Sequence, residues 1–181
     1  AKATQTAGGA DFVTMRYEGF APNKAAVIVE ALTDNKNRTA GNVRTIFGKR
    51  GGAMGESGSV AFNFERIGHI QYPASAAEAD KMFEAALEAG ANDVVSDDEY
   101  HEIETLPDDL AAVTEALEKQ FGTPSVSRLD WKPTVKSEIN DLETAQKFLD
   151  FIDALEEDDD VQHVYHNAEI ADSILAELAK E

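Results

Sequence analysis

The segment from residue 67 to residue 131 carries the pattern that most restricts how this chain can fold. Strand-like runs and helical patterns follow one another there in the order β-α-β-β-α-β. The strand-like runs are residues 67–72, 93–96, 100–106 and 126–131. Apolar side chains recur at helical spacing in the two intervening stretches, namely Ala79, Met82, Phe83 and Ala86, then Leu110, Val113, Leu117 and Phe121. This order is that of a ferredoxin-like sandwich.

The flanking segments are incomplete on their own. Upstream, strand-like runs at 12–17 and 25–32 precede a helix and one further strand, and downstream a single helix precedes a strand at 161–166. Because neither part can close a sandwich alone, we predict that they combine. The predicted fold class is therefore α+β, with two ferredoxin-like-type α/β sandwich domains, the second inserted into a discontinuous first. The predicted boundaries are 10–66 with 137–181 for the first domain and 67–134 for the second.

Local signals predict where several elements begin. Thr39 is a suitable cap for the upstream helix, because its hydroxyl can accept a bond from a free backbone N–H of the first turn. Val60, Phe62 and Phe64 alternate with less apolar residues, which indicates a half-buried strand. Ser75 followed by Glu78 predicts a capping box at the first helix of the inserted segment.

The charge and composition exclude several function classes. The 181 residues carry a formal net charge of -19, so the surface as a whole repels a phosphate backbone. The chain has no cysteine, which excludes disulfides and thiolate metal sites and suits a reducing cytoplasm. No apolar run approaches the roughly 20 residues of a membrane-spanning helix, and no signal peptide is visible. We expect a cytoplasmic protein with no membrane partner.

A local run of cations stands out against this acidity. No acidic residue lies between positions 36 and 50, and the cations there surround one predicted helix. They are Lys36, Arg38, Arg44, Lys49 and Arg50. Lysine binds phosphate as a point charge and arginine as a planar fork, so we predict that these five residues contact nucleic acid. The alternative is an ordinary solvated helix surface.

A glycine-rich loop follows the cations. Gly51, Gly52, Gly55 and Gly58 could present backbone N–H groups to a phosphate. The loop lacks the Gly-Lys-Ser/Thr ending of a nucleotide-hydrolysing P-loop. The alternative is a helix stop and a turn into the following strand.

The remaining histidines and acidic runs do not predict a metal site or a catalytic site. His163 and His166 lie three apart, which on a strand directs them to opposite faces, so we predict no metal site. The acidic runs 97–99 and 156–160 lack the spacing of a calcium loop and are predicted to be solvated turns. They offer an alternative contact for a basic protein partner. No nucleophile, base and orienting group occur in a recognisable set, so we predict no catalytic residues, no cofactor and no enzyme.

Several motifs in order resemble the YebC/PmpR family of regulators, to which mitochondrial translational activators of cytochrome oxidase are similar. They are Tyr17–Phe20, Ala26–Thr39, the glycine pattern of Gly51–Val60, Glu84–Ala91 and Asp160–Asn167. The resemblance implies a three-domain architecture with a further basic, helical N-terminal domain. Since the sequence begins without Met, we interpret residues 1–9 as a remnant of the linker to that domain. The family's Gly-Pro-Gly-Gly turn is replaced here by Ala21-Pro22-Asn23-Lys24.

The function that the resemblance implies is non-enzymatic regulation of gene expression. The first expectation is a DNA-binding transcriptional regulator. The alternative is a ribosome-associated translation factor that contacts ribosomal RNA. A third reading, from the acidic runs, is a module that docks a basic protein.

Overall fold

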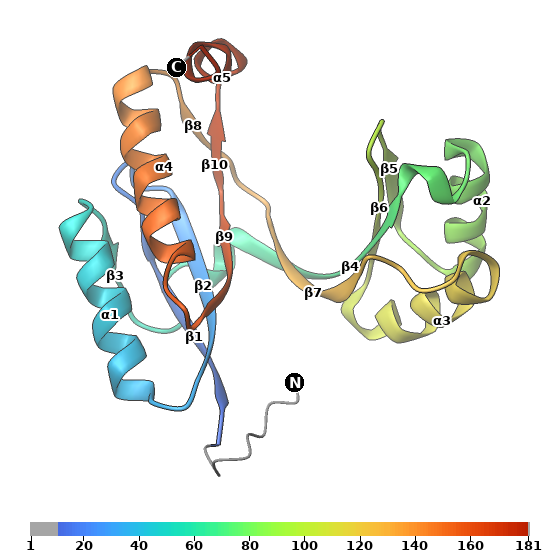
Figure 1. Cartoon of the computed structure of the whole chain (residues 1–181), viewed down its shortest axis with the longest axis horizontal. Helices are drawn as coiled ribbons and strands as arrows, with labels where there is room; N and C mark the ends of the chain where they lie inside the picture. The colour runs from blue at the N-terminus through green and yellow to red at the C-terminus, as the bar shows by residue number, and fades with distance from the viewer. Residues whose placement is uncertain (1–10, 181) are drawn as a thin grey trace. The chain divides into compact units, whose positions relative to one another are not determined.

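The computed structural model describes residues 11–180, and the chain separates into two compact units (Figure 1). Unit 1 contains the chain up to Phe64 together with the chain from Pro133 onward, and unit 2 is Glu65–Lys132. The linker predicted at residues 1–9 lies outside the described residues. No helix in the described part of the chain has the length and apolar character needed to cross a lipid bilayer.

Unit 1 is built on a four-stranded sheet in the order β3-β1-β2-β9. Its strands are β1 (Val13–Phe20), β2 (Ala26–Thr33), β3 (Ala53–Met54) and β9 (Val161–His166). β1 and β2 form an antiparallel hairpin, and β9 returns from far along the chain to pair antiparallel with β2. The Asn167 Oδ1 accepts a 2.8 Å hydrogen bond from the Ala26 N–H, which fixes the returning strand at the start of β2.

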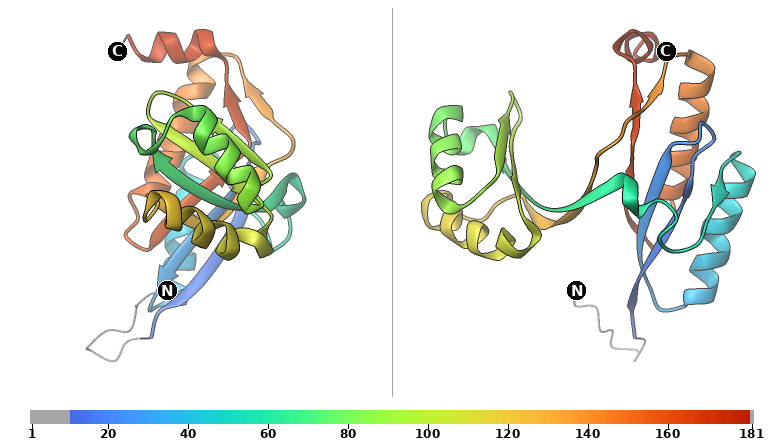
Figure 2. Two further views of the ribbon diagram at one scale, coloured as in Figure 1. Left: turned by 90° about the vertical axis from the view of Figure 1, so that its right-hand side faces the viewer. Right: turned by 180° about the vertical axis from the view of Figure 1, so that it is seen from behind.

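Two helices, α1 (Lys36–Lys49) and α4 (Leu142–Glu156), cover the same face of this sheet (Figures 1 and 2). Phe47 of α1 and Phe151 of α4 meet edge to face with ring centroids 5.0 Å apart. Val27 and Val29 of β2 lie beneath them and are fully buried. A parallel pair, β8 (Ser137–Ile139) with β10 (Ala168–Ile170), and the short helix α5 (Asp172–Leu178) complete the unit.

Unit 2 is a second sandwich, with strand order β5-β6-β4-β7. Its elements are β4 (Phe64–Pro73), α2 (Ala79–Ala89), β5 (Asp93–Ser96), β6 (Tyr100–Thr105), α3 (Leu110–Phe121) and β7 (Val126–Pro133). β6 lies between β4 and β5 and is antiparallel to both, which is the split β-α-β arrangement of ferredoxin-like folds. The buried core contains Ile70, Tyr72, Met82, Ile103, Val113 and Leu117. The predicted α+β fold class is confirmed.

The predicted cap of the upstream helix is wrong. α1 begins one turn earlier than expected, because the Asn35 Oδ1 accepts a 3.0 Å bond from the Arg38 N–H and so caps the helix. Thr39 lies inside the first turn and is fully buried. Its hydroxyl donates instead to the carboxylate of Asp160, at 2.7 Å.

Two other local predictions are also wrong. The expected strand at residues 60–64 is a short 3₁₀ helix, Ala61–Asn63, and only Phe64 belongs to a strand. The N–H groups that a strand would pair are taken by the carboxylate of Glu18. The capping box is absent, because Ser75 lies in a separate 3₁₀ turn, Ala74–Ala76, and Glu78 precedes α2 without a side-chain cap bond.

Candidate nucleic-acid interface

The five predicted cations are all exposed, but they do not form one patch. Lys36 and Lys49 are the two ends of α1 and are separated by roughly 20 Å at 1.5 Å per residue. Helical geometry places Arg38 and Lys49 on nearly the same side and Arg44 on the other flank, roughly 120–140° away. Arg50 is the C-cap residue. The structure therefore brings Lys49 and Arg50 together and separates the other three.

Arg38 is held in a structural contact. Its Nη2 lies 3.0 Å from the Asp160 Oδ2 and 3.1 Å from the Asp34 Oδ1. Burial opposes ionisation of Asp160, but hydrogen bonds from Thr39, Arg38 and Thr33 outweigh it and lower the pKa of that carboxyl below its usual range. Arg38 thus ties the start of α1 to the loop before β9.

Lys49 and Arg50 line a cleft of about 460 Å³ at the C-terminal end of α1. The other lining residues are Pro22 and Gly51, with Lys147 and Asp150 from α4. We call this set the basic cleft. Lys147 is 66% exposed and its only ion pair in the described chain is a 3.7 Å approach to Glu143, which is weak. Three cations and one carboxylate line the cleft, so its local charge is opposite to that of the chain.

The turn between β1 and β2 forms one wall of the basic cleft. The Lys24 N–H donates to the Ala21 carbonyl at 2.8 Å, and the Ala21 N–H donates to the Ala25 carbonyl at 2.9 Å. This is a turn followed by a residue in the left-handed region, a position that favours glycine in hairpins. Lys24 occupies it with φ 69°, and within residues 11–180 no other non-glycine residue has a positive φ.

Replacing Lys24 with glycine is therefore expected to raise the free energy of unfolding by about 0.5–1 kcal/mol. The left-handed conformation costs an L-residue about 1–2 kcal/mol, and part of the relief is offset by the flexibility of glycine in the unfolded chain. Urea unfolding of the two proteins measures the difference. Lys24→Ala is the matched control, because it removes the charge and keeps the strain, and it should not stabilise the fold. A glycine variant no more stable than the alanine variant would contradict this account.

The glycine-rich loop does not present its amides to a ligand. The Gly51 and Gly52 N–H groups donate to the carbonyls of Gly48 and Phe47, at 3.4 and 2.8 Å. The Gly55 N–H donates to the backbone carbonyl of Glu18 at 2.8 Å, and the Gly58 N–H donates to its Oε2 at 2.9 Å. Each of the four amides has a partner within the fold, so of the two possibilities that the sequence left open, the structure favours the helix stop and turn over a phosphate cradle.

Glu18 organises this loop, and no motif or spacing in the sequence predicts this role. Its side chain lies on β1, is 1% exposed, and accepts bonds from the N–H groups of Gly58, Val60 and Ala61 at 2.9–3.1 Å. The Arg16 Nε lies 3.3 Å from the Oε2. Burial alone would raise the pKa of Glu18, but these hydrogen bonds and Arg16 lower it below its ordinary value.

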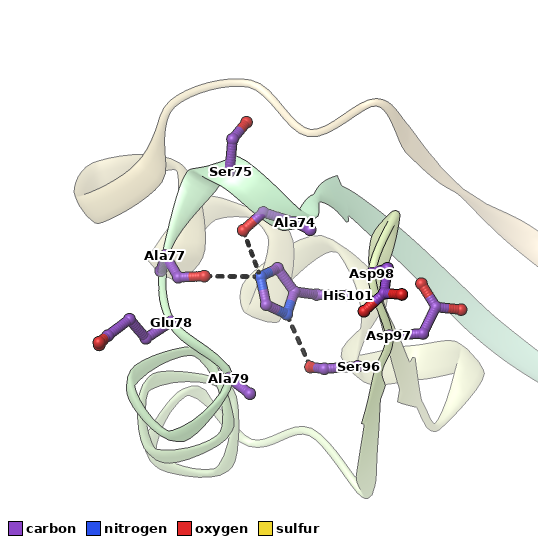
Figure 3. Close-up of a pocket in the computed structure, with 9 residues that line it drawn as sticks. All are labelled: Ala74, Ser75, Ala77, Glu78, Ala79, Ser96, Asp97, Asp98 and His101. Atoms are coloured by element: carbon purple, nitrogen blue, oxygen red, sulfur yellow. Dashed lines mark hydrogen bonds between the residues drawn. The ribbon is translucent and has the colours of Figure 1, made fainter.

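Unit 2 contains a larger open cleft, of about 660 Å³, around His101 (Figure 3). The His101 Nε2 lies 2.9 Å from the Ala77 carbonyl oxygen, so Nε2 carries the hydrogen and donates to it. The Nδ1 then accepts from the Ser96 hydroxyl at 2.6 Å. Because His101 is only 2% exposed and both ring nitrogens have partners, the pair joins β5 and β6 to the segment before α2.

The acidic run at 97–99 closes the β5–β6 turn beside this cleft. The Asp97 Oδ1 accepts from the N–H groups of Glu99 and Tyr100, at 2.8 and 2.9 Å. These bonds lower the pKa of Asp97. Within the described residues, no group of three or more histidine or acidic side chains is arranged to hold a metal ion. A basic partner for this turn stays a prediction.

One family model and one solved structure are similar to this chain. The transcription-regulator family model described as "TACO1/YebC second and third domain" matches residues 12–168. The structure is also similar to the crystal structure of the conserved hypothetical protein Aq1575 from Aquifex aeolicus, with a TM-score of 0.85 and 45% sequence identity. That similarity covers 94% of this chain and 70% of the other.

Proposed function

Because the chain belongs to the TACO1/YebC family, a family of transcription-regulator type and not an enzyme family, we propose that it regulates gene expression by binding nucleic acid at the basic cleft. The observation that carries the proposal is the convergence of Lys49, Arg50 and Lys147 from two helices. These cations lie together in a chain with a net charge of -19.

Because salt screens distant charges, the basic cleft can attract phosphate groups despite the negative net charge of the chain. At physiological salt the Debye length is about 8 Å, so acids elsewhere on the surface weaken the attraction only in part. Arg50 can bind a phosphate through two parallel hydrogen bonds, while the lysines contribute point charges. Lys36 and Arg44, which form no ion pair within the described residues, extend the positive surface along α1.

The first candidate target is promoter DNA, and the alternative is ribosomal RNA. Contacts to phosphate position a protein on either nucleic acid and do not read sequence. The cleft therefore fits both, and binding experiments with both nucleic acids distinguish the two targets.

Binding to duplex DNA and to ribosomes across a salt series tests the proposal. The test variant replaces Lys49, Arg50 and Lys147 with alanine. If each contacts one phosphate, we expect the slope of log K against log salt on the duplex to become shallower by about 2–3, since each contact contributes roughly 0.9. The cleft variant should also bind ribosomes more weakly than the wild type, and its affinity for them should depend less steeply on salt.

The matched control replaces three exposed lysines outside the cleft, Lys81, Lys119 and Lys180, and changes the net charge by the same amount. It should keep the wild-type slope on the nucleic acid that is bound. Equal slopes for the wild type and the cleft variant on both targets would overturn the proposal.

A further inference from the structure

The sheet of unit 1 has a second face, opposite α1 and α4. Residues of neighbouring strands form two rows across it, Glu18–Ile28–Tyr165 and Arg16–Glu30–His163. Their alternate neighbours Val27 and Val29 point into the helical core, which assigns the rows to the other face. We call this surface the open face, because α1 and α4 both pack on the opposite side of the sheet (Figure 1).

The glycine-rich loop covers one end of the open face. Its Val60 and Ala61 N–H groups are bonded to Glu18, and Val60 and Ile28 are fully buried. The other end carries an aromatic pair. The rings of His163 and Tyr165 on β9 lie with centroids 5.9 Å apart and planes at 39°, and both side chains are half-buried.

His166 has no part in this surface. Its ring packs edge to face on Phe148 of α4, with centroids 4.8 Å apart, and burial there lowers its pKa. The two histidines therefore lie on opposite faces, and only His163 accompanies Tyr165.

Phe62 projects from the loop that covers the open face, and it is 77% exposed, the most of any large apolar side chain in the described chain. Its backbone is fixed on both sides. The Ala61 N–H donates to the Glu18 Oε1 at 2.9 Å, and the Asn63 carbonyl accepts from the Thr134 N–H at 2.9 Å. An exposed aromatic ring on a rigid backbone loses little conformational freedom when it binds a flat partner.

A cation accompanies the aromatic side chains. The Arg16 Nε contacts the same carboxylate that holds the Ala61 N–H, and the Arg16 side chain is 43% exposed. β1 and β9 flank β2, so roughly 10 Å separates their backbones at about 4.8 Å per strand. Arg16 and Tyr165 thus lie on one face of the sheet, together with the half-buried Glu30, and Phe62 belongs to the loop that covers one end of this face.

We propose that the open face binds unpaired bases of single-stranded nucleic acid, with Tyr165 and Phe62 as stacking platforms and Arg16 as the phosphate contact. Four-stranded sheets that present aromatic side chains stack bases in this way. Duplex bases are already stacked on one another, so they cannot use these rings. This inference rests on the proposed function, which supplies nucleic acid as the class of ligand. It adds that the bound nucleic acid is single-stranded.

Fluorescence anisotropy with three labelled probes tests this: a short uridine oligonucleotide, the matching thymidine oligonucleotide, and a duplex of the same length. The variants are Phe62→Ala and Tyr165→Leu, the latter keeping an apolar side chain in a half-buried position. We expect each to weaken single-strand binding by roughly 5- to 100-fold, in line with the loss of one stacked base, and to leave duplex binding unchanged. Phe62→Trp should retain binding, and Phe83→Ala, which removes a 45% exposed phenylalanine from α2, should have no effect.

The outcomes separate this inference from the proposed function. Equal loss on single strands and duplex, or no loss in either aromatic variant, overturns the open-face assignment. If the cleft variant loses phosphate binding in the same assay while the aromatic variants do not, the proposed function survives and the stacking inference fails. If the wild type prefers the uridine probe the ligand is RNA, and if it prefers the thymidine probe the ligand is DNA. Single-strand binding that depends on Phe62 and Tyr165 supports the inference in both cases.

Discussion

Replacing Glu18 with glutamine is expected to lower the free energy of unfolding by about 2–4 kcal/mol. The carboxylate is 1% exposed and accepts three backbone hydrogen bonds, and bonds to a charged acceptor contribute about 1.5–3 kcal/mol each when they are lost with unsatisfied donors left behind. A glutamine amide can accept at one end only, and its NH₂ group would face the Gly58 N–H and the Arg16 guanidinium. Urea unfolding measures the loss.

The same substitution should remove a pH dependence. Although burial raises the pKa of Glu18, its hydrogen bonds hold the folded-state pKa below the value in the unfolded chain, about 4.3. Its stabilising contribution is therefore complete above that pH and is lost as the pH falls through the folded-state pKa. Wild-type stability should fall across this window more steeply than that of Glu18→Gln.

Glu56→Gln is the matched control, because Glu56 is an exposed carboxylate in the same loop. It should change stability by no more than about 0.5 kcal/mol. A Glu18→Gln protein as stable as Glu56→Gln at neutral pH would show that the loop is held by other contacts.

Replacing Gly19 with alanine is expected to lower the free energy of unfolding by about 3 kcal/mol or more. A Cβ at this position would lie 2.6 Å from the Ala53 carbonyl oxygen and 2.6 Å from the Phe47 ring, with the Met54 Cα at 2.9 Å. Gly19 pairs with Met54 where β3 joins the sheet, so backbone and core would both have to move. Thermal and urea unfolding measure the loss.

Gly41→Ala is the control within the same unit. Gly41 lies inside α1 and a Cβ there meets nothing within 4 Å. Alanine should therefore stabilise the helix by about 0.5–1 kcal/mol. If Gly19→Ala and Gly41→Ala shift stability in the same direction, the close approach of β3 to β1 does not constrain position 19.

Periodicity was sufficient to predict the layers of the fold. Helical spacing at Met82 and Val113 and the strand runs between them defined the order of unit 2, because each pattern reports on a single element. The family resemblance is confirmed by the match over residues 12–168. Element starts were less predictable. Thr39 and Asn35 are both good caps, and the choice depends on Asp160, a residue from the far end of the chain.

The candidate interface was predicted only in part, because some of its residues come together from segments that are far apart in the sequence. Lys49 and Arg50 are neighbours in sequence, whereas Lys147 joins them only because α1 and α4 pack side by side. Glu18 reads as one polar residue in an alternating strand, and its role appears only when the glycine-rich loop folds over it. The sequence left open whether the loop amides are available to a ligand; in the fold each of them has a partner, and the carboxylate of Glu18 accepts only from the Gly58 N–H among the four glycines.

The most direct test of the account is an amide chemical-shift map of the ¹⁵N-labelled chain during titration with a single-stranded oligonucleotide and, separately, with duplex DNA. We expect the shifted amides to belong to unit 1, around Lys49 to Gly51, Lys147 and the open face near Tyr165. Shifts confined to unit 2 around Asp97 to Glu99, or no shifts at any nucleic acid concentration, would contradict it. The first of these outcomes would favour a module that docks a basic partner.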